Sequence, residues 1–195
     1  MSRESGLPPL VAGRPHLWCM SLHGHDRPEG RAALRRVVSA YAGIAPRDLS
    51  LTSGEYGKPL FPGLPWQASV AHTTGMLVVA VAVEQAVGVD VEPWDAAGRA
   101  ASVIDAELDD DERSALDTLT GSARERAALV AWVRLEAVAK ATGDGLMTSA
   151  AARRAARRRL ACRTIDIRSH HVAAVAVTGP LDDVVVGHCT AIPWT

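Results

Sequence analysis

The sequence predicts an α+β fold in which the order of one helix followed by strands occurs twice. Apolar residues recur at helical spacing between residues 29 and 42, Val-rich runs follow between residues 76 and 92, and the same order returns after residue 122. The chain of 195 residues is 48% hydrophobic and 22% charged, which is the composition of a globular protein with core for one or two small domains.

The N-terminal part is expected to contain one helix and little other regular structure. Residues up to about 25, rich in Pro, Gly and His, predict irregular structure around an apolar patch at residues 17–20. Helical spacing predicts a helix over residues 29–42, and Gly43 is its stop signal. Gly and Pro recur so often between residues 49 and 66 that a loop with short extended pieces is expected there.

The strongest strand signal lies in the middle of the chain. Residues 76–83 and 86–92 are rich in β-branched side chains and are separated by two residues, which predicts an antiparallel hairpin. In the second strand, Asp90 and Glu92 are two residues apart and therefore share one face of the strand. The intervening valines occupy the opposite face.

The C-terminal part is expected to begin with two helices, followed by a third helix and two strands. Acidic residues at the start of residues 109–119 favour the positive end of a helix dipole. A longer helix is predicted from Ser122, with Glu125 completing a capping box, to Thr142, where Gly143 ends it. Three further elements are expected, a helix over 150–160 and strands over 171–177 and 184–192.

Charge and cysteine content exclude several classes of protein. The 21 Lys and Arg against 22 Asp and Glu give a net charge of -1, which argues against a surface built for nucleic acid or an anionic membrane. The three cysteines are widely spaced and support neither a disulfide framework nor a zinc site. The longest apolar run, residues 76–83, is far shorter than the ~20 residues of a membrane span, and no signal peptide pattern precedes it. A cytoplasmic protein is therefore expected, and the scarcity of lysine is typical of a GC-rich bacterial coding sequence.

The carboxylates of Asp90 and Glu92, joined by Glu136 from the long helix, form a candidate metal site. Magnesium prefers a few carboxylates and completes its octahedron with water and phosphate oxygens. The residues alone leave a second interpretation open, in which the strand carboxylates face water and Glu136 forms a surface ion pair with Lys140 one helical turn later.

Four segments in order resemble the Sfp-type 4′-phosphopantetheinyl transferases. They are GEYGKPLF (54–61), SVAHTTG (69–75), GVDVE (88–92) and WVRLEAVAKATGDGL (132–146). The family patterns are GKP, a Ser-His segment before a strand, G-[IV]-D-[IV]-E, and W-x-x-K-E-A-x-x-K-x-x-G-x-G-[LI]. Because a chance match to all four in order is improbable, the combination is more specific than any one motif. The resemblance extends from about Arg31 to Val177, most of the chain.

The resemblance implies two similar halves related by a pseudo-two-fold axis, each a long helix on a small, mostly antiparallel sheet, with coenzyme A in the cleft between them. The halves would be residues 1–85, on the nucleotide side, and residues 86–195, on the metal and phosphate side. The implied reaction moves the 4′-phosphopantetheine arm of coenzyme A to a serine of an acyl or peptidyl carrier protein. It also implies a monomer, whereas the expectation of no nucleic-acid or membrane partner comes from the net charge and the short apolar run.

The family motifs assign roles to the acidic and basic residues of the second half. By resemblance, Asp90, Glu92 and Glu136 hold Mg²⁺, and Glu112 is a further acidic residue near the metal. Lys140 meets the phosphates. Glu136 or a metal-linked water takes the proton of the serine hydroxyl, so the implied catalytic residues are Glu136 and Lys140.

The nucleotide-binding residues implied by resemblance lie in the first half. Lys58 of the GKP motif lies near the nucleotide, and His72 approaches the 3′-phosphate. Family members also carry basic residues ahead of the first helix, where this chain is short; Arg35, together with Arg31 and Arg36, is a candidate substitute.

Three departures from the family pattern suggest an alternative function. Leu135 stands where the family has the first lysine of K-E, Ala71 replaces the serine before the motif histidine, and the N-terminus is short. The alternative is a repurposed member of the same fold in small-molecule, natural product biosynthesis that has lost transfer activity.

An arginine-rich segment between residues 153 and 163 is a further departure from the family. Two interpretations stay open for it: a solvated helix face, or a docking surface for an acidic partner such as a carrier protein.

Overall fold

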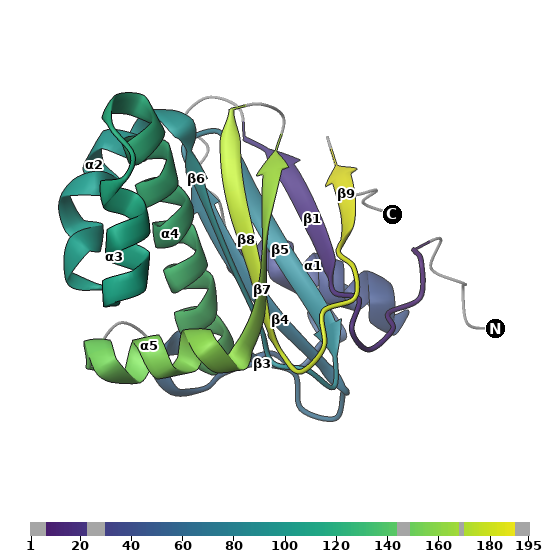
Figure 1. Ribbon diagram of the computed structural model, residues 1–195. Coiled ribbons are helices and arrows are strands. Elements are labelled where there is room, and N and C mark those ends of the chain that lie inside the picture. The colour runs from purple at the N-terminus through teal and green to yellow at the C-terminus, as the bar shows by residue number, and fades with distance from the viewer. Residues whose placement is uncertain (1–6, 23–29, 144–148, 168–169, 190–195) are drawn as a thin grey trace.

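The computed structural model describes residues 7–22, 30–143, 149–167 and 170–189. Two sheets pack against each other, and one helix covers the outer face of each sheet (Figure 1). Helix α1 (Gly30–Ala42) covers the first sheet, and helix α4 (Gly121–Thr142) covers the second. The fold is α+β, as the sequence predicts.

The first sheet has the strand order β4-β5-β1-β9. Strand β5 (Met76–Val83) is antiparallel to both β4 (Trp66–Thr73) and β1 (His16–Ser21). The C-terminal strand β9 (Val185–Cys189) runs parallel to β1 and completes the sheet. A separate short pair is formed by β2 (Thr52–Ser53) and β3 (Pro59–Leu60).

The second sheet is antiparallel, with the order β6-β8-β7. Its strands are β6 (Val87–Pro93), β7 (Leu160–Ile167) and β8 (His171–Thr178). Val87, Val89 and Val91 of β6 are buried against the first sheet. The valines of β6 thus belong to the core between the sheets, as the alternation in the sequence predicts.

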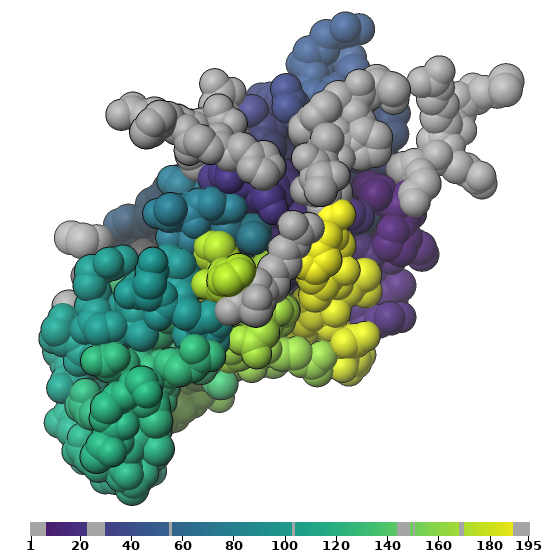
Figure 2. All heavy atoms as spheres, turned by 90° about the horizontal axis from the view of Figure 1, so that it is seen from above, coloured from purple at the N-terminus to yellow at the C-terminus, as the bar shows by residue number. Residues whose placement is uncertain are grey.

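The other helices gather beside α4 at one end of the molecule, and β1 and β9 lie toward the opposite end (Figure 2). They are α2 (Ala97–Val103), α3 (Asp110–Asp117) and α5 (Ala150–Arg159). Short 3-10 turns at Trp94–Ala96 and Ile104–Ala106 flank α2, whereas the turn at Pro46–Asp48 follows α1 and the turn at Glu55–Gly57 lies between β2 and β3. Among the described residues, no helix combines the length and apolarity that crossing a membrane requires.

Several predicted elements are confirmed. Helix α1 ends before Gly43, whose φ of 65° suits a residue without a side chain. Helix α4 ends at Gly143 in the left-handed conformation. Helix α3 begins with a capping box between Asp109 and Glu112. The helix over 150–159 and the strands β8 and β9 also match, although the predicted residues 190–192 of the last strand lie outside the described part of the chain.

The predicted hairpin between residues 76–83 and 86–92 is wrong. Both segments are strands, but they belong to different sheets. Strand β5 instead forms its hairpin with β4, across a two-residue turn in which Gly75 has φ of 76°. The connection to β6 is fixed by Gln85, whose side chain accepts a hydrogen bond from Gly13 N (2.6 Å) and donates to Thr178 O (2.7 Å). These long-range contacts are invisible to local pattern analysis.

Other elements differ from the prediction or were missed. Residues 16–21, predicted as irregular, form the central strand β1, because pairing with β5 and β9 overrides the local Pro and Gly signals. The expected capping box at Ser122 is absent, since α4 already begins at Gly121. Strands β4 and β7 and helix α2 were not predicted from the sequence.

Gly88 sets the distance between β6 and α4. A Cβ atom at this position would lie 2.0 Å from Ala137 O and 2.3 Å from Ala141 N, far inside van der Waals contact. The strand and the helix backbone therefore touch directly at this point. The same face of β6 carries Asp90 and Glu92 two and four residues later, so this contact positions both carboxylates beside α4.

We expect Gly88→Ala to destabilise the fold by about 1–3 kcal/mol, because α4 must move away from β6 to admit a methyl group. Thermal or denaturant unfolding measures the change. Gly98→Ala in α2 is the matched control, since a Cβ there meets no atom within 4 Å, and it should leave stability unchanged or raise it. Equal stability of Gly88→Ala and wild type would contradict the close contact.

Candidate active site

Asp90 is the most enclosed carboxylate of the site. Its side chain is 9% exposed, and its Oδ1 accepts a hydrogen bond from Lys140 Nζ at 2.7 Å. This ion pair links β6 to α4, the two elements that meet at Gly88. Strand and helix therefore bring together two residues that stand 50 positions apart in the sequence.

The second oxygen of Asp90, Oδ2, is buried and has no hydrogen-bond partner among the described residues. Burial raises the pKa of this carboxyl above its ordinary value, against the opposing effects of the Lys140 ammonium and the Val91 backbone. A buried carboxylate oxygen without a partner is costly, and a cation bound beside it would satisfy it.

Glu92 and Glu136 complete a group of mutually repelling carboxylates. Burial, and then repulsion from Asp90, raise the pKa of Glu92, although Thr73 Oγ1 donates to Glu92 Oε2 at 3.2 Å. Burial, followed by repulsion from Asp90 and Glu92, raises the pKa of Glu136, and Lys140 opposes the shift. The three carboxylates are thus electrostatically coupled.

The carboxylate oxygens of Asp90, Glu92 and Glu136 are ligands of the type that a hard divalent cation prefers. Three carboxylates that repel one another, one of them with a buried unpaired oxygen, form an environment that a cation would relieve. In the part of the chain that the structure describes, however, no three Asp, Glu, His or Cys side chains lie close enough to share one ion. The joint metal site therefore stays a prediction.

A cavity of about 320 Å³ is lined by Glu136 and Lys140. Asp90 and Glu92 do not line it, although Asp90 pairs with Lys140. One side is formed by residues 56–59 and by Ser69 and Val70 of β4, and the other by α4, with Glu136 and Lys140 on its wall. Its size falls within the range of small-molecule sites, about 300–1,000 Å³. Segments from both parts of the chain thus meet at one cavity that contains two lysines and a carboxylate.

Lys58 joins the loop between β2 and β3 to the end of α4. Its ammonium donates to the backbone oxygen of Lys140 at 3.0 Å and to that of Ala141. These carbonyls belong to the last turn of the helix, where a positive charge is favoured by the helix dipole. Lys58 and Lys140 therefore line the same cavity, which agrees with a shared role toward an anion.

The remaining predicted site residues lie elsewhere. His72 is exposed on β4 and is not part of the cavity wall. Arg35 donates to the backbone oxygens of Pro46 (3.0 Å) and Leu49, so it ties α1 to the following turn. Glu112 belongs to the capping box of α3 and lines a different cavity from Glu136. Their proposed roles toward coenzyme A or metal remain predictions.

Three residues at the site were missed by sequence reasoning. Arg99 of α2 lowers the pKa of Glu92 against the effect of burial, and Thr73 donates to the same carboxylate. Tyr56 lies at the cavity, is 60% exposed, and has φ of 52°, an unusual conformation for a residue with a side chain. Neither the unusual backbone conformation of Tyr56 nor the exposure of its ring can be read from sequence patterns.

Two of the departures from the motifs lie in the core. Leu135 is 2% exposed, although Glu136 beside it lines the cavity. Ala71 is buried between the two sheets. An apolar residue at position 135 therefore fits its surroundings, and a lysine there would place its charge within the packed interior.

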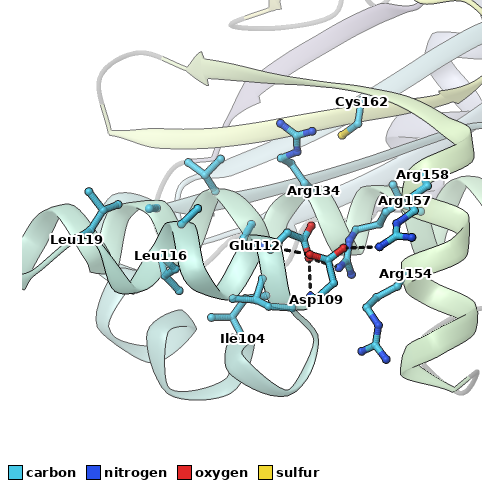
Figure 3. Close-up of a pocket in the computed structure, with 16 residues that line it drawn as sticks. Ile104, Asp109, Glu112, Leu116, Leu119, Arg134, Arg154, Arg157, Arg158 and Cys162 are labelled. Atoms are coloured by element: carbon cyan, nitrogen blue, oxygen red, sulfur yellow. Dashed lines mark hydrogen bonds and ion pairs between the residues drawn. The ribbon is translucent and has the colours of Figure 1, made fainter.

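The arginine-rich segment is engaged within the protein. Arg153 Nε donates to Glu107 Oε2 at 2.8 Å, with side chains only 13% and 17% exposed. Two more pairs, Arg157–Glu112 (2.5 Å) and Arg158–Asp109 (3.0 Å), join α5 to the start of α3 (Figure 3). Part of this arginine cluster is therefore an internal connection, which neither interpretation of the sequence predicted.

Comparison with known proteins identifies one family. A family model described as the 4′-phosphopantetheinyl transferase superfamily matches residues 86–187, just over half of the chain. A comparison with curated proteins gives no match. The matched region contains Asp90, Glu92, Glu136 and Lys140.

We expect Glu136→Gln to stabilise the protein at neutral and alkaline pH. Because the pKa of Glu136 is higher in the fold than in the unfolded chain, the wild type loses stability as the pH rises through the folded-state pKa, and Gln removes that loss. Below the unfolded pKa the advantage should vanish. Melting temperatures measured from about pH 3.5, below the unfolded-state pKa, to about pH 8 test this, with Glu125→Gln on the exposed part of α4 as control. A variant less stable than wild type at every pH would contradict the coupling.

Proposed function

Because the chain belongs to the 4′-phosphopantetheinyl transferase superfamily, we propose that it moves the 4′-phosphopantetheine arm of coenzyme A to a serine of an acyl or peptidyl carrier protein. Family members use coenzyme A as substrate and act on carrier proteins. The observation that best supports the proposal is the cavity where Lys58, Lys140 and Glu136 meet beside the Asp90–Glu92 strand.

The proposal assigns the walls of this cavity to the two parts of the chain. Residues 1–85 supply the nucleotide side, with Lys58 in the cavity wall as a cation for the ligand's phosphates. His72 and Arg35, which lie outside the wall, are proposed to contact phosphate beyond it. Residues 86–195 supply the metal and pyrophosphate side. Since Lys58 and Lys140 line one cavity, a pyrophosphate between them would receive charge-assisted hydrogen bonds from both sides.

Asp90, Glu92 and Glu136 are the residues that would hold Mg²⁺. A bound Mg²⁺ would neutralise negative charge on the pyrophosphate and so lower the barrier to phosphoryl transfer. The unpaired Oδ2 of Asp90 and the mutual repulsion of the carboxylates support this assignment.

Glu136 is the proposed general base, which accepts the proton of the serine hydroxyl. The hydroxyl oxygen attacks the β-phosphorus of coenzyme A, the bond between that phosphorus and the bridging oxygen breaks, and adenosine 3′,5′-bisphosphate leaves. A carboxylate whose pKa is raised by burial and by neighbouring carboxylates is a better proton acceptor than an ordinary one. Lys140, held at 2.7 Å by Asp90, would balance charge on the transferring group.

Tyr56 is the candidate surface for the adenine ring. Its exposed side chain lies at the cavity, beside the glycine and lysine of the GKP motif. Backbone strain of this type persists where the surrounding structure requires the conformation, and it is concentrated at functional sites. An aromatic ring is also a platform on which a nucleobase can stack.

One observation favours the alternative function, a repurposed member of the family in small-molecule biosynthesis. Position 135 holds a buried leucine, whereas the family motif has a lysine directly before the glutamate that corresponds to Glu136. The cation of the motif is therefore absent from this position. If no other residue replaces it, the pyrophosphate would bind less tightly, by roughly 10- to 150-fold for one charge-assisted hydrogen bond.

The transferase proposal predicts that an apo carrier protein, incubated with this protein, coenzyme A and Mg²⁺, gains the mass of phosphopantetheine. Glu136→Gln should reduce the rate by about 10²–10⁴-fold while the fold is retained, because general-base assistance is lost. Intact-mass spectrometry measures the product, and Glu125→Gln is the control on the same helix. Full activity of Glu136→Gln would exclude its catalytic role, and no modification of any carrier tested would favour the alternative.

A second prediction concerns Leu135. We expect Leu135→Lys to lower the free energy of unfolding by about 3–5 kcal/mol, since an ammonium would be buried without a partner. Leu135→Met, which conserves volume and polarity, should change stability little. Denaturant unfolding and calorimetry with coenzyme A measure both variants. Unchanged stability with tighter coenzyme A binding would show instead that position 135 reaches the phosphates.

A further inference from the structure

A second cavity, of about 380 Å³, lies between α3, α4, α5 and β7 (Figure 3). It is separate from the proposed active site, because Arg134 and Val138 line it from one side of α4 while Glu136 and Lys140 line the other cavity. Residues two positions apart in a helix point about 200° apart, so α4 separates the two cavities. Neither the family match nor the proposed transfer reaction assigns a role to this second cavity.

The floor of the second cavity is apolar. Ile104, Leu108 and Leu116 form a buried cluster with Ala128 of α4, and all three large side chains line the cavity. Ala131 and Val138 extend this surface along α4. An apolar chain placed here would be removed from water, which is the main favourable contribution to binding such a group.

The rim of the second cavity carries an excess of positive charge. Four arginines line it, against the two carboxylates of Asp109 and Glu112. Arg157 and Arg158 pair with those carboxylates, as described above. Within the described residues, Arg134 and Arg154 form no ion pair with an acidic side chain, so the lining contains two more arginines than carboxylates.

Arg157 adds a buried donor to this rim. Its side chain is 13% exposed, and its Nη1 atom is buried with no hydrogen-bond acceptor among the described residues. An unsatisfied buried donor is unfavourable, and a guanidinium is well suited to a carboxylate or phosphate oxygen. The Arg157 side chain lines the cavity, but Nη1 has almost no accessible surface, so an anion in the cavity would reach this donor only after a movement of the side chain.

We propose that the second cavity binds a small amphipathic anion, namely an aliphatic carboxylate whose chain lies on the apolar floor and whose head group is held by the arginines. A small molecule fits the observations better than an acidic protein surface, because the apolar floor of the cavity is formed by buried side chains that a flat surface does not reach. The volume of about 380 Å³ is that of a small-molecule site. The inference goes beyond the proposed transfer reaction and does not depend on it.

Octanoate, used below its micellar concentration, is the probe, with acetate and octanol as matched compounds that lack the chain or the charge. Octanoate should bind in calorimetry and raise the melting temperature, whereas acetate and octanol at equal concentration should not. Arg154→Met and Arg134→Met should each weaken octanoate binding by about 10-fold or more, the equivalent of one charge-assisted hydrogen bond. Ala131→Leu, which fills the floor, should weaken it while all charges remain.

Arg159→Met is the control, because Arg159 is an exposed arginine of the same helix that does not line the cavity. Equal binding of octanol and octanoate, or octanoate binding that is insensitive to Arg154→Met and Ala131→Leu, would overturn the proposal. So would the absence of octanoate binding together with slower carrier modification by Arg154→Met, which would assign the arginines to protein docking. Coenzyme A binding, measured in parallel, reports on the first cavity alone, so failure of the two proposals can be distinguished.

Discussion

The direct contact between strand β6 and the backbone of helix α4 at Gly88 is the constraint on which the candidate site depends. Any residue with a side chain would push the strand and the helix apart, because a Cβ atom would lie 2.0 Å from a helix carbonyl oxygen. The contact fixes the face of β6 that looks toward the helix. Since strand residues alternate, the same geometry points Asp90 and Glu92 toward α4, where Lys140 pairs with Asp90 and Glu136 lies within electrostatic range of both carboxylates.

This arrangement places three carboxylates where they are unfavourable. Burial raises the pKa values of all three carboxyls, and repulsion between carboxylates adds to the rise at Glu92 and Glu136. The Lys140 ammonium, and the Arg99 guanidinium near Glu92, oppose these shifts but do not reverse them. Packing alone would favour apolar side chains at such positions. Groups with shifted pKa values beside a cavity are typical of sites that bind ions or transfer protons, so the cost in stability is itself an argument for function.

Local sequence patterns predicted those elements that local interactions specify. The glycine stops of α1 and α4, the acidic start of α3 and the shared face of Asp90 and Glu92 were all predicted correctly. Strand pairing was not, because it depends on contacts distant in sequence: β5 pairs with β4 and β1, and Gln85 bonds to residues 72 and 93 positions away. Of the residues that the motifs single out, Lys58, Glu136 and Lys140 line the first cavity, and their roles stay predictions. The contributions of Tyr56, Thr73 and Arg99 follow only from the three-dimensional structure.

The arginine-rich segment shows why composition predicts charge but not its use. Arg153, Arg157 and Arg158 recur at helical spacing. From the sequence alone, the segment could be a helix face exposed to water or a docking surface for an acidic partner. In the fold, the capping residues of α3 face this side of α5 and pair with Arg157 and Arg158, while Glu107 pairs with Arg153. These pairs attach α5 to α3 and to the segment that precedes α3, and two of the pairs line the second cavity. Arg134 and Arg154, which form no ion pair among the described residues, line the same cavity as the apolar floor. Arginines that served only to keep the surface soluble would not need an apolar cavity beside them.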